Sequence, residues 1–453
     1  MNEEKTGAIE GSERGAVLIV AILLMVCMAV MAAPFLARLS GQYRTTDRGY
    51  KSMAAFNLAE AGVDMAVFEL NSTWLIFDWQ AAEDGTLTRT LDDLAGSGGD
   101  VVGDADIRIH PLVGEERIVN SKGKVPFIAD RIVDRSVEVV LKAEYGSIFK
   151  FAVFADEGIY MASNTLIDSY DTNEALAYDD RAAGANGHVG TNSSIPAASG
   201  GGIYMSSHDT IRGNIACGVG TPAGSVDSVI DSTAANTSIE GGKYVLGTPF
   251  NMTLDPPASS FVSGLTYNPA HPDLAAGSKG GVTIINSAKS GIYDSFVIDV
   301  NSKARIEGDV TLYITGTGRQ TGEFLMKNNS TLEIAPGSSL KLILGDTTFT
   351  QLSNTSVNNL TKTASNLVIL GTEEFTGEMH WNSNTDLYGA IAVPEASLHY
   401  DSNYDLYGSL VCDYLDFDAN ADIHYDEALG KLDWIKGGVP RYTVKSWQER
   451  PGI

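Results

Sequence analysis

The sequence has little cysteine and none of the common signatures of a catalytic site. Three cysteines in 453 residues are too few for a disulfide framework. The zinc-protease, redox, nucleophile-elbow and phosphate-loop patterns (HExxH, CxxC, GxSxG and Walker A) are all missing. The seven histidines show no metal-ligand spacing, although His380, His399 and His424 lie near corners of a repeat and could stack in register. We therefore expect no catalytic residue, no metal site and no cofactor.

Positive charge is also scarce. The chain has 31 Lys and Arg residues against 57 Asp and Glu, a net charge of -26 and a pI near 4.5. Such a balance argues against nucleic acid as a partner and against adhesion to anionic membrane surfaces. The acidic residues are dispersed along the chain, which is typical of a domain kept soluble outside the cell.

Charge is absent altogether from residues 16–37, a run of 22 residues that Arg38 follows. At about 1.5 Å per residue, a helix of this length crosses the roughly 30 Å of a bilayer core. A polar helix then continues for about two turns beyond residue 62. The sequence predicts one transmembrane and stem helix over residues 16–72.

Three features in order resemble the amino-terminal segment of PilX-type minor pilins of the type IV pilus. They are Arg14-Gly15, the hydrophobic helix from Ala16, and the sequence Leu58-Ala59-Glu60-Ala61-Gly62. The resemblance covers about residues 13–72. It implies that residues 1–15 are a leader, which a prepilin peptidase removes between Gly15 and Ala16. It also implies that Ala59, Glu60, Ala61 and Gly62 form a helix signature, and that other pilins are partners through this helix.

The same resemblance implies a position and a location. Val20 stands where major pilins have a glutamate, which implies a minor, initiating or tip position. The implied location is the inner membrane, crossed once, with the carboxyl-terminal domain periplasmic or extracellular on a pilus.

The charges beside the span favour the opposite orientation. Two basic residues precede the span, and four follow it within 14 residues: Lys5 and Arg14, then Arg38, Arg44, Arg48 and Lys51. The positive-inside rule alone would keep the following domain in the cytoplasm. A cleaved secretory signal and a plain single-pass anchor are the competing interpretations of the apolar run.

Strand patterns replace helical ones after residue 73. Glycine-rich loops lie in residues 84–104, and apolar residues alternate with other residues from Val137 to Tyr145, which is typical of a half-buried strand. We expect a β-rich connector over residues 73–150.

Residues 151–453 repeat themselves. The segment 158–167 is echoed by 202–211, and Asn384–Gly389 recurs at Asn403–Gly408 and more weakly at Asn420–Tyr425. Intervals of 19 and 17 residues, with Asn, Asp and Gly at the corners, fit single coils of a β-helix. The predicted fold is therefore mainly β: one amino-terminal helix, the connector, and a single-stranded β-helix (solenoid). Tyr442–Trp447 is expected to be a strand that caps the last coil.

Residues 146–450 also resemble the β-solenoid domains found behind PilX-type amino termini, and more distantly the bactofilin polymers. We expect a minor pilin or pseudopilin-like subunit of a type IV pilus or related secretion system, acting in assembly, at the tip or in adhesion. A membrane-anchored, bactofilin-like scaffold is the alternative.

A surface polysaccharide-active enzyme is a third interpretation. Its nearest candidate cluster contains Asp168, Asp171, Asp179 and Asp180. Surface glycans are a candidate ligand for the aromatic residues of the repeats, which in-register ladders inside the coils would equally explain: Trp381, Tyr388, Tyr400, Tyr404 and Tyr407.

Overall fold

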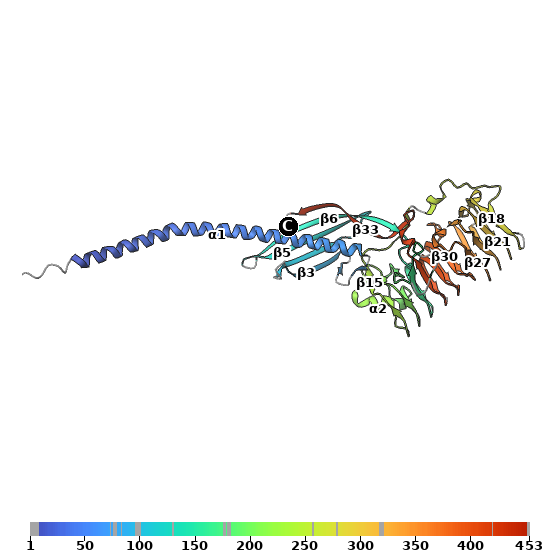
Figure 1. The fold of residues 1–453 in the computed structure, drawn as a ribbon, viewed down its shortest axis with the longest axis horizontal. Helices are drawn as coiled ribbons and strands as arrows, with labels where there is room; N and C mark the ends of the chain where they lie inside the picture. Colours follow the sequence, from blue (N-terminus) through green and yellow to red (C-terminus); the bar gives the residue numbers. More distant parts are fainter. Residues whose placement is uncertain are drawn as a thin grey trace, which may run out of the picture.

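A single long helix precedes a body made of strands in the computed structural model (Figure 1), as the sequence predicts. The structure describes residues 9–72, 74–75, 79–82, 84–95, 101–128, 131–174, 178, 183–255, 258–277, 280–316, 321–418 and 420–450. Within these ranges the side chains of 9–16, 74–75, 101, 255 and 258–259 are not described. The long helix, α1, covers Ile9–Asn71, and α2 (Val226–Val229) is a single turn.

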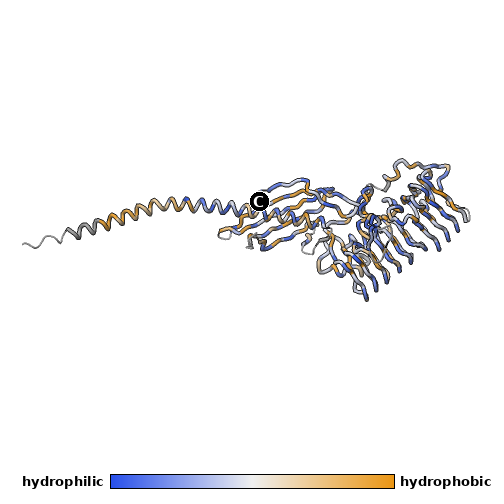
Figure 2. Tube along the Cα trace, in the orientation of Figure 1, coloured by the Kyte–Doolittle hydropathy of each residue, from blue (hydrophilic) through white to orange (hydrophobic). Residues whose placement is uncertain are grey.

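The first half of α1 exposes its apolar side chains. The large apolar residues from Val17 to Leu39 are 45–68% exposed. Figure 2 shows them as an apolar stretch that projects away from the body. By length and composition this segment can cross a bilayer. Nothing in the described part of the chain covers it, so its apolar surface needs lipid or another molecule.

The second half of α1 packs on a seven-stranded antiparallel sheet in the order β16-β33-β6-β5-β4-β3-β2. The strands of this sheet are β2 (Gln80–Ala81), β3 (Leu87–Ala95), β4 (Val101–Ile109), β5 (Glu116–Pro126), β6 (Ile132–Ser147), β16 (Asn251–Asp255) and β33 (Lys436–Arg450). Alternation along β6 buries Val137, Val139 and Leu141 against the helix. The expected strand around residues 137–145 is present.

The carboxyl-terminal strand does not cap the coils, which corrects the sequence prediction. Tyr442–Trp447 lies within β33, and β33 pairs antiparallel with β6, with Trp447 opposite Val139. Because β6 is 16 residues long, it offers enough free edge to take the whole of β33. The connector sheet therefore draws two strands, β16 and β33, from the part of the chain assigned to the β-helix.

The remaining strands form stacked coils, here called the coil stack (residues 153–246 and 273–426). Its first run contains β7 (Val153–Met161), β8 (Leu166–Tyr170), β9 (Val189–Thr191), β10 (Gly202–Met205), β11 (Thr210–Ile211), β12 (Ile215–Cys217), β13 (Ile230–Asp231), β14 (Ser238–Ile239) and β15 (Lys243–Leu246). Its second run contains β17 (Asp273–Ala276), β18 (Val282–Asn286), β19 (Gly291–Tyr293), β20 (Ser295–Ile298), β21 (Lys303–Glu307), β22 (Asp309–Ile314), β23 (Gly322–Met326), β24 (Thr331–Ile334), β25 (Ser339–Leu344), β26 (Thr347–Gln351), β27 (Ser356–Asn359), β28 (Leu367–Gly371), β29 (Glu378–Trp381), β30 (Leu387–Tyr400), β31 (Leu406–Phe417) and β32 (Ile423–Asp426). Successive coils pair in parallel, and the repeated segments lie in register: Leu387 is opposite Leu406, and Leu406 is opposite Ile423.

The two runs meet in the middle of the coil stack. The first run starts at β7 and proceeds to β15, which is paired antiparallel with β1 (Trp74–Leu75). The chain then passes through β16 and begins the second run at β17, which pairs with β20 of the same run. The second run winds back until β31 pairs with β7. The first coil in sequence is thus covered on both sides, by β10 and by β31.

Asparagines turn the chain at corners of the coils, as expected. Asn301, Asn329 and Asn354 have φ of 55°, 57° and 58°, in the left-handed region that asparagine tolerates better than most residues. The Asn329 side-chain amide donates to the Asn301 side-chain oxygen at 3.1 Å, so neighbouring corners are also joined to each other.

The aromatic residues of the repeats divide between the interior and the surface. Trp381 and Tyr400 are buried, and the Trp381 ring stacks on Phe349 with centroids 5.9 Å apart. Tyr388 and Tyr407 stack on each other at 4.3 Å, and Tyr404 is exposed. Four of the five rings thus belong to stacked ladders, as predicted, but Tyr388 is only half-buried and Tyr404 is exposed.

Candidate functional sites

The docked face of α1 is built from small residues. Ala55, Ala59, Gly62 and Ala66 are buried at helical spacing, on the side of α1 that faces the sheet. The opposing strands supply glycines where the backbones come closest. A Cβ on Gly123 of β5 would overlap the carbonyl oxygen of Ala55. Close approach of two backbones therefore fixes where α1 lies on the sheet.

The helix signature divides between this docked face and the surface. Ala59 and Gly62 face the sheet, and a Cβ on Gly62 would overlap the Ser121 hydroxyl. Ala61 is exposed and Glu60 is half-buried. Among the described residues, no hydrogen bond or ion pair of the Glu60 carboxylate is found. Half of the signature thus serves docking within the chain, and the other half is available to neighbours.

The expected cleavage position lies within α1. Gly15 and Ala16 belong to the helix Ile9–Asn71, but their side chains are outside the described residues. The sheet glycines, by contrast, were missed by sequence reasoning. Their only signal is a glycine inside an otherwise regular strand, which marks a site of close backbone approach.

The polar end of α1 is fastened to the carboxyl-terminal strand. The Asn71 side chain donates to the Tyr442 carbonyl at 3.0 Å and accepts from the Tyr442 N–H at 2.6 Å. Glu69 is buried and pairs with Arg89 of β3 at 2.8 Å. These contacts hold the end of the helix rigidly against both halves of the sheet.

Two of the four aspartates proposed for an enzyme, Asp168 and Asp171, lie in the described part of the chain, and they have different partners. Asp168 is fully buried, where its carboxylate lies 2.6 Å from His424 Nδ1 and accepts a hydrogen bond from the Tyr178 hydroxyl at 2.6 Å. Asp171 instead pairs with Lys431 at 2.5 Å, and Asp179 and Asp180 lie outside the described residues. The Tyr178 ring covers the His424 ring with centroids 3.8 Å apart. This arrangement satisfies Asp168 internally.

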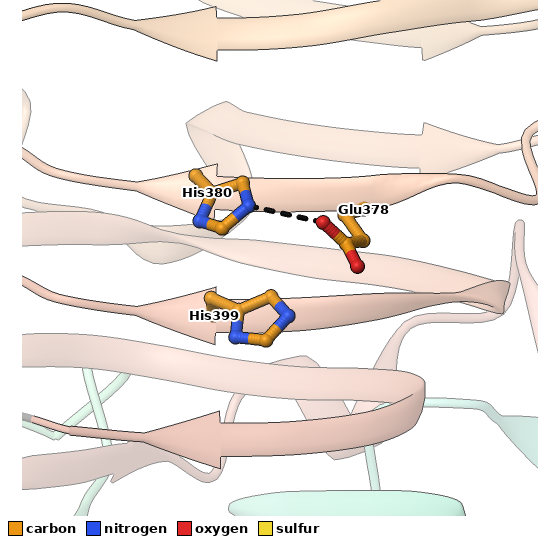
Figure 3. A group of neighbouring side chains, drawn as sticks. All are labelled: Glu378, His380 and His399. Carbon is orange, nitrogen blue, oxygen red and sulfur yellow. Dashed lines mark hydrogen bonds and ion pairs between the residues drawn. The ribbon is translucent and has the colours of Figure 1, made fainter.

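One group of side chains in the described residues could hold a metal ion: Glu378, His380 and His399 (Figure 3). Glu378 and His380 lie on β29, and His399 is opposite His380 on β30. The two imidazole rings stack with centroids 4.6 Å apart, and His380 Nε2 lies 3.3 Å from a Glu378 carboxylate oxygen. The expected stacking in register is present for His380 and His399, with Glu378 beside them, but not for His424, which is opposite Tyr407.

Comparison with known proteins finds a family model and solved structures that are similar to this chain. A family model described as a domain of unknown function (DUF7305) matches residues 275–432, essentially the second run of the coil stack. Among solved structures, the chain is similar to the crystal structure of the competence-associated pilin ComZ from Thermus thermophilus. The two are 12% identical, with 88% of this chain and 97% of that chain covered and a TM-score of 0.33. No curated protein matches. Because chains that superpose this weakly need not share a fold, the function proposed below depends on the residues themselves.

Proposed function

We propose that this chain is a minor pilin-like subunit of a type IV pilus or a related secretion system. Its amino-terminal helix is held in the inner membrane, and its coil stack, a β-solenoid, is displayed outside the cell for pilus assembly, tip function or adhesion. One observation carries the proposal: α1 is a single helix whose first half is apolar and uncovered and whose second half is docked by small residues. Such a first half is stable in lipid or among similar helices.

The proposed partners follow from the same helix. A prepilin peptidase removes residues 1–15 by cutting between Gly15 and Ala16, as the resemblance to PilX-type pilins implies. The half-buried Glu60 and the exposed Ala61 contact neighbouring pilins. Surface glycans are a proposed ligand of the exposed ring of Tyr404 (43% exposed).

Shearing of surface filaments tests this function. We expect the chain to appear in the sheared fraction together with the other pilins of the cell. Leu24→Arg puts a charge in the uncovered apolar half of α1, so we expect this variant to be missing from that fraction. Leu352→Arg, at a 40% exposed position of the coil stack, is the matched control and stays in it. Absence of the wild-type chain from sheared filaments of a piliated cell contradicts the proposal.

A membrane-anchored cytoplasmic scaffold is the second candidate, favoured by the basic residues after the span, from Arg38 to Lys51. A reporter fused after Ile453 separates the two. When the reporter is an enzyme that works only outside the cytoplasm, such as alkaline phosphatase, we expect the fusion to be active. Activity of a cytoplasm-only reporter would support the scaffold instead.

We propose no enzymatic role, because Asp168 is buried and satisfied by His424 and Tyr178. We expect the full chain to leave acidic polysaccharides intact. Turnover that is abolished by Asp168→Asn would revive the enzyme interpretation.

A further inference from the structure

We propose that Glu378, His380 and His399 bind a zinc ion that bridges two consecutive coils. The proposal is independent of the function proposed above. Two imidazole nitrogens and a carboxylate oxygen are typical ligands of Zn²⁺, with bond lengths of about 2.0–2.2 Å. In the described structure the three ligand atoms already lie within 4.8 Å of one another.

The spacing of these atoms suits one ion. Two ligands of a tetrahedral zinc are about 3.3 Å apart, given bonds of roughly 2.05 Å. His380 Nε2 and the Glu378 carboxylate oxygen are 3.3 Å apart. The His399 ring, which is stacked nearly parallel to the His380 ring, must tilt for both Nε2 atoms to reach one ion, and the exposed or half-buried positions of the three side chains leave room for this.

Carboxylates behind the rings provide a second, independent indication. The Nδ1 atom of His380 lies 3.8 Å from an Asp401 oxygen, and the Nδ1 atom of His399 lies 3.4 Å from an Asp416 oxygen. Each ring therefore has a carboxylate near Nδ1, although not within a hydrogen bond, and this leaves Nε2 for the ion. Zinc-binding histidines usually have such an outer partner, which fixes the ring and makes its free nitrogen a better ligand.

The ion would have a structural and a binding consequence. Its ligands come from β29 and β30, so it adds a link between two coils that backbone pairing and ring stacking already hold together. Three protein ligands leave the fourth tetrahedral position toward solvent, where water or a donor from another molecule completes the shell.

Zinc titration of the full-length chain in detergent, without a histidine tag, tests the proposal. By isothermal titration calorimetry we expect one Zn²⁺ per chain, retained in excess Mg²⁺ or Ca²⁺. His380→Ala and His399→Ala should each weaken binding at least about 100-fold, and Asp416→Asn about 10–100-fold. His271→Ala, which removes an exposed histidine elsewhere, is the matched control and leaves binding unchanged.

Thermal unfolding provides a second readout that also reports whether each variant folds. Saturating zinc should raise the Tm of the wild type and of His271→Ala, but not of His380→Ala or His399→Ala. Stoichiometric zinc binding by the double variant His380→Ala/His399→Ala, or none by the wild type, overturns the proposal.

Discussion

Single asparagines hold the corners of the coil stack in a backbone conformation that most residues avoid. Asn329 has φ of 57°, and its side chain also reaches the Asn301 side chain of the neighbouring coil. The residue therefore has two separable roles, one in the backbone and one in the contact between corners.

Substitutions at Asn329 separate these roles. Asn329→Ala should lower the free energy of unfolding by about 1–2 kcal/mol, because alanine is strained at this positive φ. Asn329→Gly should cost less than Asn329→Ala, since glycine adopts the conformation freely and only the exposed side-chain hydrogen bond is lost. Urea unfolding of the full chain in detergent measures both. Equal losses of unfolding free energy in the two variants would show that the backbone conformation of Asn329 does not contribute to stability.

His188 gives the coil stack a dependence on pH. Burial lowers the pKa of its imidazole from 6.5 to about 4, and its Nδ1 accepts a hydrogen bond from the Asn214 N–H at 3.0 Å. The neutral ring is thus required in the folded state, while the unfolded chain binds a proton near pH 6.5. The contribution of His188 is complete above pH 6.5 and is lost as the pH falls toward 4.

A neutral replacement isolates this effect from the other titrating groups. We expect the Tm of the wild type to fall more steeply than that of His188→Gln between pH 6.5 and 4.5. The difference between the two curves reports His188 alone, since all other groups are shared. Parallel curves over this range would contradict the buried neutral ring.

At the scale of elements, the contact between α1 and its sheet depends on the absence of side chains. Gly123→Ala places a methyl group into the Ala55 carbonyl, so α1 must shift. We expect a loss of at least about 3 kcal/mol in the free energy of unfolding, toward the upper end of overpacking effects. Gly377→Ala, where a Cβ meets nothing within 4 Å, should change it by less than about 0.5 kcal/mol. Comparable effects of both substitutions would refute close docking.

The elements were more predictable than their arrangement. The repeats around Leu387, Leu406 and Ile423 predicted neighbouring coils, because equivalent apolar residues must stack to be buried. Repetition alone cannot say which coil is first, and Ile159 is opposite both Ile203 and Leu415. The predicted position of β33 was wrong for a related reason. Its alternating pattern fits any free sheet edge, so the sequence cannot say which edge it joins.

The repeat predicted that His380 and His399 could stack, but it did not predict that they form a group with Glu378. Known zinc patterns place ligands a few residues apart on one turn or loop. His380 and His399 are 19 residues apart, the length of one coil, so they become neighbours only when the coils stack. The buried contact between His424 and Asp168 could not be predicted from the sequence either, since these residues are 256 apart in the chain.

At the scale of the whole molecule, one buried side chain joins the sheet to the coil stack. Arg117 of β5 donates to the His110 carbonyl at 2.9 Å, to the Gly247 carbonyl at 3.0 Å and to the Thr248 hydroxyl at 2.5 Å. Gly247 and Thr248 follow β15 at the end of the first run. Arg117 and the pairing of β16 with β33 therefore both connect the sheet to the coil stack.

Loss of this arginine should loosen the junction. Arg117→Met leaves two carbonyls without a donor, so we expect the free energy of unfolding to fall by about 2–4 kcal/mol. Chymotrypsin, which cleaves after large apolar residues, should also cut first between residues 247 and 273, where the chain passes between the two runs. Arg441→Met, at an exposed position of β33, is the control and should behave as the wild type. An unchanged stability of Arg117→Met would show that the two parts are held by other contacts.

The intact mass of the chain purified from its own cell membrane tests the central claim most directly. A pilin-like subunit enters its filament with a processed amino terminus, so the account predicts a mature chain that begins at Ala16. Gly15→Leu should block this processing and leave the longer form. A wild-type chain that still begins at Met1 would contradict the account.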